Sequence, residues 1–178
     1  MKIVEELLPG VFLIEPSSFV DDRGNFVKTY HLDTWNGLGL PFEMKEEFYS
    51  FSKKDVIRGM HFQVPPADHR KVVCCMSGAV FDVLVDIRQG PNFGATGSVE
   101  LSVENRLILY IPSGIAHGFK SLRDDTLMLY KTDTVHNAAY DRGLHWDSVG
   151  IDWRVNKPIV STRDSMHPKL AEFQTPFF

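Results

Sequence analysis

Three side chains that can carry a proton or a positive charge lie close together in the first half of the chain. Arg58 and His61 belong to Val-Ile-Arg-Gly-Met-His-Phe-Gln (56–63), and Lys71 follows after two prolines. In a regular strand Arg58 and His61 would point to opposite faces, but Gly59 predicts a bulge that turns both into one cavity. Each residue alone would be interpreted as a surface charge or a core histidine. Together the three favour an anion-binding pocket.

A second motif reads Ile-Pro-Ser-Gly-Ile-Ala-His-Gly-Phe (111–119). Its Pro-x-Gly-x-x-His pattern resembles the second motif of cupin barrels, in which a turn delivers a strand whose histidine, here His117, points into the barrel. The first cupin motif usually carries two histidines, and their positions here are His61 and Gln63. Because the second histidine is replaced and no glutamate stands at the matching distance, we expect no metal ion in this cavity.

Short apolar segments separated by turn signals must position these residues. Ser77-Gly78 and Pro112-Ser113-Gly114 are strong turn signals, and β-branched residues are frequent between them. The predicted strands are 11–14, 56–63, 72–76, 79–87, 106–111, 115–122 and 126–132. Short helices are expected at 31–35 and 169–173. We therefore predict an all-β fold, a cupin-type jelly-roll β-barrel of two antiparallel sheets with a few short helices.

Composition sets the wider limits. The chain has 178 residues, of which 43% are hydrophobic and 24% charged, as expected for a single domain over residues 1–178. A net charge of −4 argues against nucleic-acid and membrane-surface partners. No apolar run could span a membrane, and the first residues carry two glutamates where a secretory signal would be basic, so we expect a cytoplasmic enzyme. The adjacent Cys74 and Cys75 are interpreted as small core residues.

The order of the motifs along the chain is more informative than any one of them. They are Asp-x-Arg-Gly-x-Phe (21–26), Arg-Gly-x-His-Phe-Gln (58–63), Lys-Val-Val (71–73), Pro-x-Gly-x-Ala-His-Gly-Phe (112–119), Tyr-Lys-Thr (130–132), Ile-Asp-Trp (151–153) and Ser-x-Arg-Asp (161–164). This series, which runs from about Pro9 to Asp164, resembles the dTDP-4-dehydrorhamnose 3,5-epimerase family. Such enzymes invert carbons next to the C4 ketone of a nucleotide-linked sugar.

The resemblance implies a division of labour for the proton transfer. His61 would be the base and Asp164 the carboxylate that fixes its tautomer and stabilises the imidazolium. Tyr130 would be the acid that returns a proton from the opposite side, and Lys71 would stabilise the enolate oxygen. Because no redox step occurs and the chain has no GxGxxG motif, we expect no cofactor.

The same resemblance implies which residues bind the nucleotide-diphosphate sugar. Positions that contact the diphosphate or the sugar are matched by Arg23, Arg58 and His117. The other predicted substrate-binding residues are Gln63, Phe26, Lys28, Glu46, Phe48, His136, Asp141 and Arg163. The resemblance also implies a homodimer, in which the apolar strand at 11–14 could pair across the subunits.

Three departures from the family pattern fall at the nucleotide end of the expected site. Lys28 stands where a glutamate is usual, Glu46 begins a segment where Gln-x-Asn is usual, and His136 replaces a second tyrosine. Exchanging donors and acceptors in this way could follow a change of base, because thymine and cytosine present reversed patterns. Drift at a tolerant rim stays open as an alternative. We predict that the preferred nucleotide is not dTDP, with CDP the leading candidate and GDP next.

The predicted function is therefore epimerisation at C3, C5 or both of a nucleotide-diphosphate 4-keto-6-deoxy sugar. Three alternatives keep the fold: a 4-keto sugar nucleotide ketoisomerase, a metal-dependent cupin dioxygenase or isomerase, and a non-catalytic sugar-binding cupin. The combination of His61, Tyr130 and Asp164 argues against a binding protein, because binding alone needs neither a base nor an acid. The sequence leaves open which carbon is inverted and which sugar is used.

Overall fold

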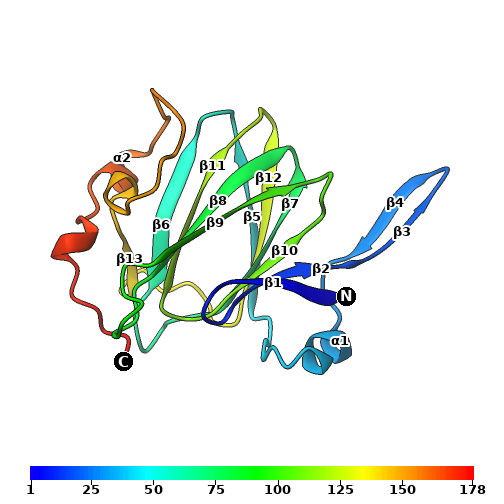
Figure 1. The fold of residues 1–178 in the computed structure, drawn as a ribbon, viewed down its shortest axis with the longest axis horizontal. Coiled ribbons are helices and arrows are strands. Elements are labelled where there is room, and N and C mark those ends of the chain that lie inside the picture. Colours follow the sequence, from blue (N-terminus) through cyan, green and yellow to red (C-terminus); the bar gives the residue numbers. More distant parts are fainter.

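The computed structural model describes residues 1–178 as two antiparallel β-sheets that face each other in a jelly-roll barrel (Figure 1). The larger sheet has the order β1-β2-β10-β7-β12-β5. Its strands are β1 (Lys2–Leu8), β2 (Val11–Glu15), β5 (Glu46–Ser52), β7 (Lys71–Ser77), β10 (Ile108–Ile111) and β12 (Thr126–Thr132). The smaller sheet has the order β13-β6-β11-β8-β9. Its strands are β6 (Ile57–Gln63), β8 (Ala79–Asp86), β9 (Thr96–Ser102), β11 (Ile115–Ser121) and β13 (Asp141–Gly143).

Helices are few and short, which confirms the predicted all-β class. They are α1 (Leu32–Gly37), α2 (Thr162–Ser165) and the 3-10 helices η1 (Trp146–Ser148) and η2 (Leu170–Glu172). The helices expected at 31–35 and 169–173 correspond to α1 and to η2, whereas α2 was not predicted. None of these helices has the length and apolar character needed to cross a bilayer.

The central strands are apolar throughout because both of their faces are covered. In β7, Val73 and Cys75 belong to the core between the two sheets. The alternate residues, Val72 and Cys74, pack outward against Trp35 of α1. A third cluster covers the outer face of the smaller sheet with the C-terminal segment. Both cysteines are free and buried, as expected of small core residues.

The prediction that the strand at 11–14 pairs across subunits is wrong, because this strand lies inside the larger sheet. Strand β2 is hydrogen-bonded to β1 on one side and to β10 on the other, so it has no free edge to offer. The sequence did not predict β1, which contains two glutamates and is largely exposed. The edges of the larger sheet are β1 and β5.

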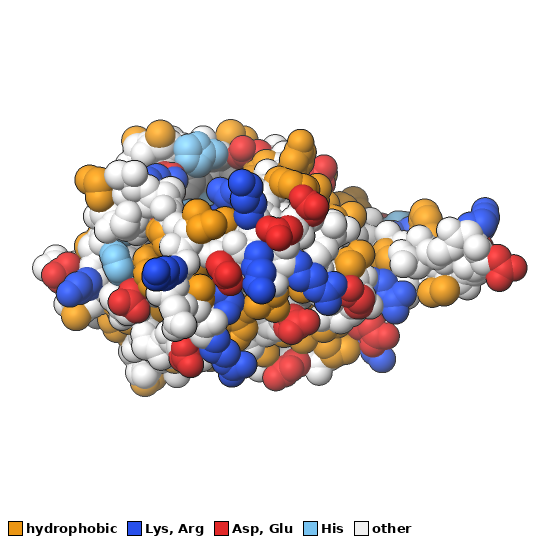
Figure 2. Space-filling model, turned by 90° about the horizontal axis from the view of Figure 1, so that it is seen from above, with side chains coloured by type: hydrophobic (Ala, Val, Ile, Leu, Met, Phe, Trp, Pro, Cys, Tyr) orange, Lys and Arg blue, Asp and Glu red, His pale blue; other side chains and the backbone are white.

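A two-stranded hairpin extends from the barrel and pairs only with itself. It consists of β3 (Ser17–Asp21) and β4 (Gly24–Lys28), and Figures 1 and 2 show it as an arm beyond the body of the molecule. The arm exposes 68% of Phe19, 71% of Val20 and 61% of Phe26 to solvent. Such large exposed apolar side chains on a self-contained hairpin mark a surface that a further contact would cover.

The predicted bulge in β6 is present and sets the direction of two site residues. Where β6 pairs with β11, it has one extra residue between Arg58 and His61, at Gly59 and Met60. Gly59 has φ of 136°, and a Cβ there would lie 2.5 Å from the Cα of Gly118. Only glycine fits this position, and the bulge turns Arg58 and His61 toward the same side of the sheet.

Candidate active site

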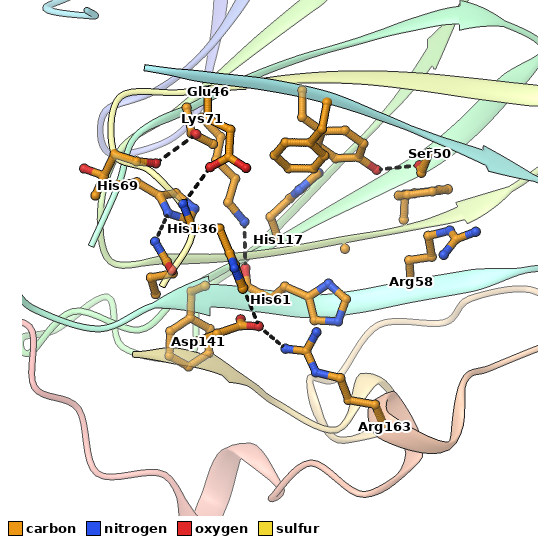
Figure 3. Close-up of a pocket in the computed structure, with 18 residues that line it drawn as sticks. Glu46, Ser50, Arg58, His61, His69, Lys71, His117, His136, Asp141 and Arg163 are labelled. Atoms are coloured by element: carbon orange, nitrogen blue, oxygen red, sulfur yellow. Dashed lines mark hydrogen bonds and ion pairs between the residues drawn. The ribbon is translucent and has the colours of Figure 1, made fainter. Parts of the chain in front are cut away.

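A cavity of about 270 Å³ opens between the two sheets, with residues of β5, β6, β7, β11 and β12 in its walls (Figure 3). His61, Lys71, His117 and Tyr130 all line it, which confirms that these four share one cavity. The remaining lining residues are Glu46, Phe48, Ser50, Arg58, Phe62, Gln63, His69, Gly118, Phe119, Thr132, Thr134, His136, Asp141 and Arg163.

His61 and Asp164 form a hydrogen-bonded pair at one wall. The imidazole Nε2 lies 2.9 Å from Asp164 Oδ1, and the two side chains are 31% and 5% exposed. Asp164 also accepts a hydrogen bond from the Gly59 amide at 3.2 Å. Burial alone would raise the pKa of Asp164, but the contacts with His61 and Gly59 hold it below its usual value. A neutral His61 that donates from Nε2 to this carboxylate keeps its lone pair on Nδ1.

Tyr130 faces the cavity from the other sheet. Its hydroxyl lies 3.1 Å from Ser50 Oγ. Its ring stacks on Phe48, with the ring centroids 4.9 Å apart and the planes 9° from parallel. Burial is the main reason that the pKa of Tyr130 is raised well above its usual value. The phenol is therefore protonated at neutral pH and can donate a proton.

The two proton carriers thus approach the cavity from opposite walls. His61 belongs to β6 of the smaller sheet and Tyr130 to β12 of the larger sheet. A planar group held between the sheets would have a base at one face and an acid at the other. This arrangement can remove a proton and return one to the opposite side of the same carbon.

Lys71 connects the two walls. It lies on β7 of the larger sheet, and its Nζ donates a 3.0 Å hydrogen bond to the backbone oxygen of His61. The side chain is only 8% exposed. Burial lowers its pKa to about 8, although the carboxylates of Asp141 and Asp82 act in the opposite direction. Near pH 7 the ammonium is charged and can stabilise negative charge that develops on a substrate oxygen.

His117 is held by a second buried carboxylate. Its Nε2 lies 2.9 and 3.0 Å from the two oxygens of Asp82, and the side chains are 4% and 0% exposed. Burial raises the pKa of Asp82, against the effect of His117. The pair fixes the ring orientation of His117 at the floor of the cavity.

Both polar atoms of the Gln63 side chain have partners in the neighbouring loops. Its amide nitrogen donates to the Ala67 oxygen at 2.8 Å and lies 2.9 Å from Nδ1 of His69. Its amide oxygen accepts from the Asn137 amide at 2.6 Å. The residue at the cupin metal-histidine position therefore uses its polar groups to hold the surrounding loops.

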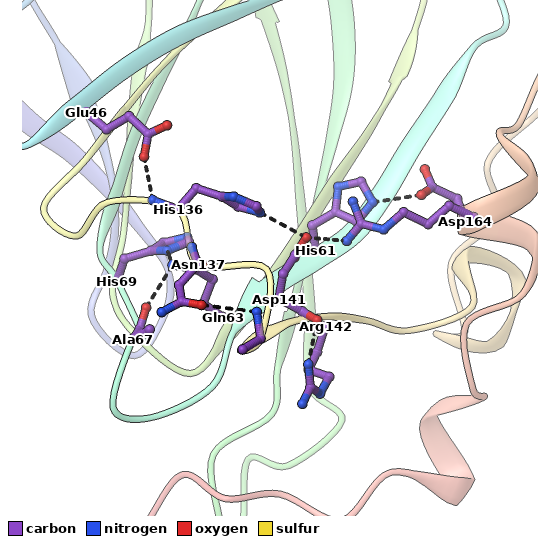
Figure 4. Close-up of polar contacts among 12 residues, drawn as sticks. Glu46, His61, Gln63, Ala67, His69, His136, Asn137, Asp141, Arg142 and Asp164 are labelled. Carbon is purple, nitrogen blue, oxygen red and sulfur yellow. Dashed lines mark hydrogen bonds and ion pairs between the residues drawn. The ribbon is translucent and has the colours of Figure 1, made fainter.

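A chain of polar contacts closes the rim of the cavity (Figure 4). Glu46 Oε2 accepts from the His136 amide at 2.6 Å. The His136 Nε2 lies 3.2 Å from Asp141 Oδ2, which also accepts from Arg163 Nη2 at 2.6 Å. These four predicted binding residues hold one another in place, and one oxygen of Glu46 is already in use.

Arg58 stands at the mouth of the cavity beside the other end of β5. Its Nε donates to Ser52 Oγ and its Nη2 to the Phe51 oxygen, both at 3.0 Å. A guanidinium has five N–H donors, so three remain for an anion such as a diphosphate.

Three predicted binding residues are not near the cavity of their own chain. Arg23, Phe26 and Lys28 lie on the projecting β3–β4 arm. Arg23 donates to Asp21 at 2.6 Å and its side chain is 90% exposed. The structure therefore separates Lys28 from Glu46 and His136, the residues with which it was grouped.

Sequence reasoning missed several residues of the cavity wall. Ser50, His69, Thr132 and Thr134 line it without having been predicted. Ser50 follows Glu46 and Phe48 at a spacing of two in β5, so strand alternation could have found it. His69 lies in a loop, and no periodicity indicates where it points.

Two sheets enclosing a histidine–aspartate pair that faces a tyrosine define a cupin-type protein with an acid–base site. The family model described as dTDP-4-dehydrorhamnose 3,5-epimerase matches residues 5–172. The enzyme of that name from Shigella flexneri is 38% identical over 176 residues, covering 97% of each chain. This protein therefore belongs to the dTDP-4-dehydrorhamnose 3,5-epimerase family.

Solved structures agree with this assignment over nearly the whole chain. The Bacillus anthracis epimerase with TDP and PPi bound superimposes with a TM-score of 0.92 at 35% identity, covering 94% of this chain and 98% of that one. The Legionella pneumophila enzyme in complex with dTDP-4-keto-L-rhamnose gives a TM-score of 0.91 at 31% identity, covering 97% and 94%. The predicted family and cupin-type jelly-roll are confirmed.

Proposed function

We propose that this protein epimerises a nucleotide-diphosphate 4-keto-6-deoxy sugar at C3, C5 or both, in deoxysugar biosynthesis. The observation that carries the proposal is the placement of His61 and Tyr130 on opposite sheets across one cavity. Inversion at carbon requires removal and return of a proton on opposite faces, whereas simple binding requires neither. Membership of the epimerase family supports the same reaction.

In the proposed mechanism His61 removes the proton from the carbon next to the ketone through Nδ1. Asp164 stabilises the imidazolium that forms. The Lys71 ammonium stabilises the enolate oxygen, because it is buried where its charge acts strongly. Tyr130 then donates its proton to the opposite face of the same carbon. Each step uses a group of this chain, and no electron transfer takes place.

The substrate class is supported by the charges at the mouth of the cavity and by the relatives. We propose that Arg58 and Arg163 pair with the diphosphate and that His117 contacts the sugar. The Bacillus anthracis relative holds TDP and the Legionella pneumophila relative a dTDP-sugar, both nucleotide diphosphates. Proton exchange is the direct test. We would incubate the protein in deuterated water with 4-keto-6-deoxy sugars on several nucleotides, and expect deuterium at C3, C5 or both. No incorporation from any of them would contradict the proposal.

The identity of the base is a separate proposal. The preference for CDP over dTDP rests on Lys28, Glu46, Phe48 and His136 and stays a prediction. Glu46 keeps one oxygen free to accept from the exocyclic amine of cytosine or guanine, which thymine lacks. Each mismatched buried polar group costs about 1–3 kcal/mol, so two would give a preference of roughly a hundredfold. Calorimetry with dTDP, CDP, GDP and UDP tests it, and tightest binding of dTDP would leave drift as the explanation.

We also propose that the protein is a homodimer in which the β3–β4 arm reaches a second copy. The arm carries Arg23, Phe26 and Lys28 away from their own cavity and exposes apolar rings. A partner would cover those rings and bring the three residues to a substrate. Light scattering tests the assembly, and a monomer at working concentration would count against it.

We propose three further properties of the protein. The chain is one domain, it works in the cytoplasm, and it needs no cofactor. Chelator treatment should not lower the exchange rate, because the amide of Gln63 occupies a position where cupin metal sites carry a histidine. A rate that falls in chelator and returns with a metal ion would contradict the last of these.

A further inference from the structure

His167 lies against the His61–Asp164 pair but takes no part in the proposed reaction. Its Nε2 is buried, has no hydrogen-bond partner, and lies 3.9 Å from Asp164 Oδ1. The ring is only 14% exposed. It stands edge-on to the His61 ring, with the centroids 5.9 Å apart. A buried ring nitrogen without a partner is uncommon and calls for an explanation.

The position of this ring is set by the backbone on two sides. His167 follows the C-cap residue of α2, three residues beyond Asp164, so the two side chains share one side of that turn. A Cβ at Gly143 of β13 would overlap the His167 ring, so the glycine leaves the space that the imidazole fills. Two imidazoles from distant segments therefore flank one carboxylate.

The three side chains present a set of donors that suits a transition-metal ion. One nitrogen or oxygen from each of His61, Asp164 and His167 lies within 4.8 Å of the other two. Two ligands of a tetrahedral zinc ion, each about 2 Å from it, are about 3.3 Å apart. The distances from Asp164 Oδ1 to the two imidazoles, 2.9 and 3.9 Å, bracket this separation.

We propose that His61, Asp164 and His167 form a binding site for a divalent transition-metal ion, with zinc the best match, and that the bound ion inhibits the enzyme. Two imidazoles and a carboxylate are the ligand types that zinc takes in sites with an open fourth position. His61 is 31% exposed and lines the cavity, which gives the ion a route of entry.

This site is distinct from the metal position of other cupins. That position uses residues equivalent to His61, Gln63 and His117. Here Gln63 is engaged with Ala67 and His69, and His117 is held by Asp82. His167 and Asp164 approach His61 from the C-terminal segment instead, so the shared ligand is the base itself.

Inhibition follows from the tautomer of His61. A metal bound at Nε2 displaces the proton from that nitrogen, so the neutral ring must carry its proton on Nδ1. The lone pair that removes the substrate proton is then lost. This consequence rests on the proposed role of His61, whereas the binding of the ion does not.

Zinc binding can be measured without substrate. The chelator-treated protein is titrated with Zn²⁺ by calorimetry beside His167→Ala and His167→Gln. Losing a direct ligand should weaken binding by at least the roughly tenfold that loss of an outer-shell partner costs. His136→Ala is the matched control, because His136 also lines the cavity but is outside the proposed set. Unchanged affinity in both His167 variants, or no binding to the wild-type protein, would overturn the site.

Inhibition by zinc is measured as the rate of deuterium exchange with and without Zn²⁺. The rate of each variant is compared with its own rate in chelator. We expect zinc to slow the wild-type protein and His136→Ala but to have at least tenfold less effect on the His167 variants. Binding without slower exchange would overturn the inhibition. Zinc binding in a protein that exchanges no 4-keto sugar at all would support the site while the proposed epimerase function fails.

Discussion

The two walls of the cavity surround their proposed proton carriers with different partners and expose them to solvent to different extents. At the β6 wall, His61 is 31% exposed and paired with the carboxylate of Asp164. At the β12 wall, Tyr130 is 8% exposed, and its partners are the neutral Ser50 and Phe48. In the proposed reaction the first wall stabilises the positive charge that forms on His61. The second wall keeps a hydroxyl protonated by withholding solvent from its charged form.

This difference teaches which proton reaches solvent more readily. A partly exposed imidazole can exchange its proton with water, whereas the buried phenol of Tyr130 has Ser50 as its hydrogen-bond partner. Exchange of the substrate proton and inversion of the carbon therefore depend on different walls. Substitutions at one wall should separate the two measurements, and substitutions at the other should not.

The largest expected effect follows from removing the base. His61→Ala should reduce deuterium incorporation at every carbon by about a thousandfold or more, because general bases contribute roughly 10²–10⁴-fold. Exchange and inversion should fall together, since no proton can leave. Proton NMR in deuterated water measures both. His145→Ala is the control, because that histidine stacks on Trp146 outside the cavity. Substantial exchange in His61→Ala would place the base elsewhere.

Lys71 lies between the walls and should give the next largest effect. Lys71→Met removes the charge proposed to stabilise the enolate oxygen and should lower turnover by about 10²–10³-fold. The wild-type rate should also fall as the pH rises through about 8, where the ammonium loses its proton. The variant should lack this alkaline decline. An unchanged pH profile in Lys71→Met would assign the decline to another group.

The same substitution should stabilise the fold. Burial lowers the pKa of Lys71 from 10.5 to about 8, so the unfolded chain binds more protons than the folded chain between those values. The wild-type free energy of unfolding should therefore rise with pH across this window. Below pH 8, removing the buried charge should add about 3 kcal/mol, and the gain should shrink toward pH 10.5. Urea unfolding at several pH values measures it.

Much of this site could be predicted because its residues belong to strands. The bulge in β6 could be predicted from Gly59, because glycine is the residue that permits it. The bulge in turn lets Arg58 and His61 share a cavity. The turn at Pro112-Ser113-Gly114 likewise delivers His117 to the interior. In strands, side-chain direction follows from alternation and turn chemistry, both of which are written locally in the sequence.

The remainder depended on long-range packing that no local pattern encodes. Asp164 reaches His61 across 103 positions of sequence, and α2, which carries it, is only four residues long. The β3–β4 arm projects from the barrel because neither large sheet pairs with it, and no local pattern in residues 17–28 predicts this. The charged strand β1 was missed because exposure on the edge of a sheet removes the apolar signal on which strand prediction relies.

Tyr130→Phe is the substitution that should separate the walls. Inversion should fall about a hundredfold, because the acid that serves the opposite face is lost. Exchange should fall much less, since a proton taken by His61 can be replaced from solvent and returned to the same face. The variant keeps the ring that stacks on Phe48, so the wall should stay packed. Equal loss of exchange and inversion would show that Tyr130 is more than a proton donor.

The smallest effect should come from Ser50, the hydrogen-bond partner of that phenol. Ser50→Ala removes a contact of 3.1 Å to the Tyr130 oxygen, and a neutral hydrogen bond contributes about 1 kcal/mol net. Inversion should therefore slow by roughly fivefold while exchange is nearly unchanged, a weaker form of the Tyr130→Phe pattern. Combining the two substitutions tests the connection, because Ser50→Ala should have no further effect once the hydroxyl is absent. An additive loss in the double variant would mean that Ser50 acts on the substrate directly rather than through Tyr130.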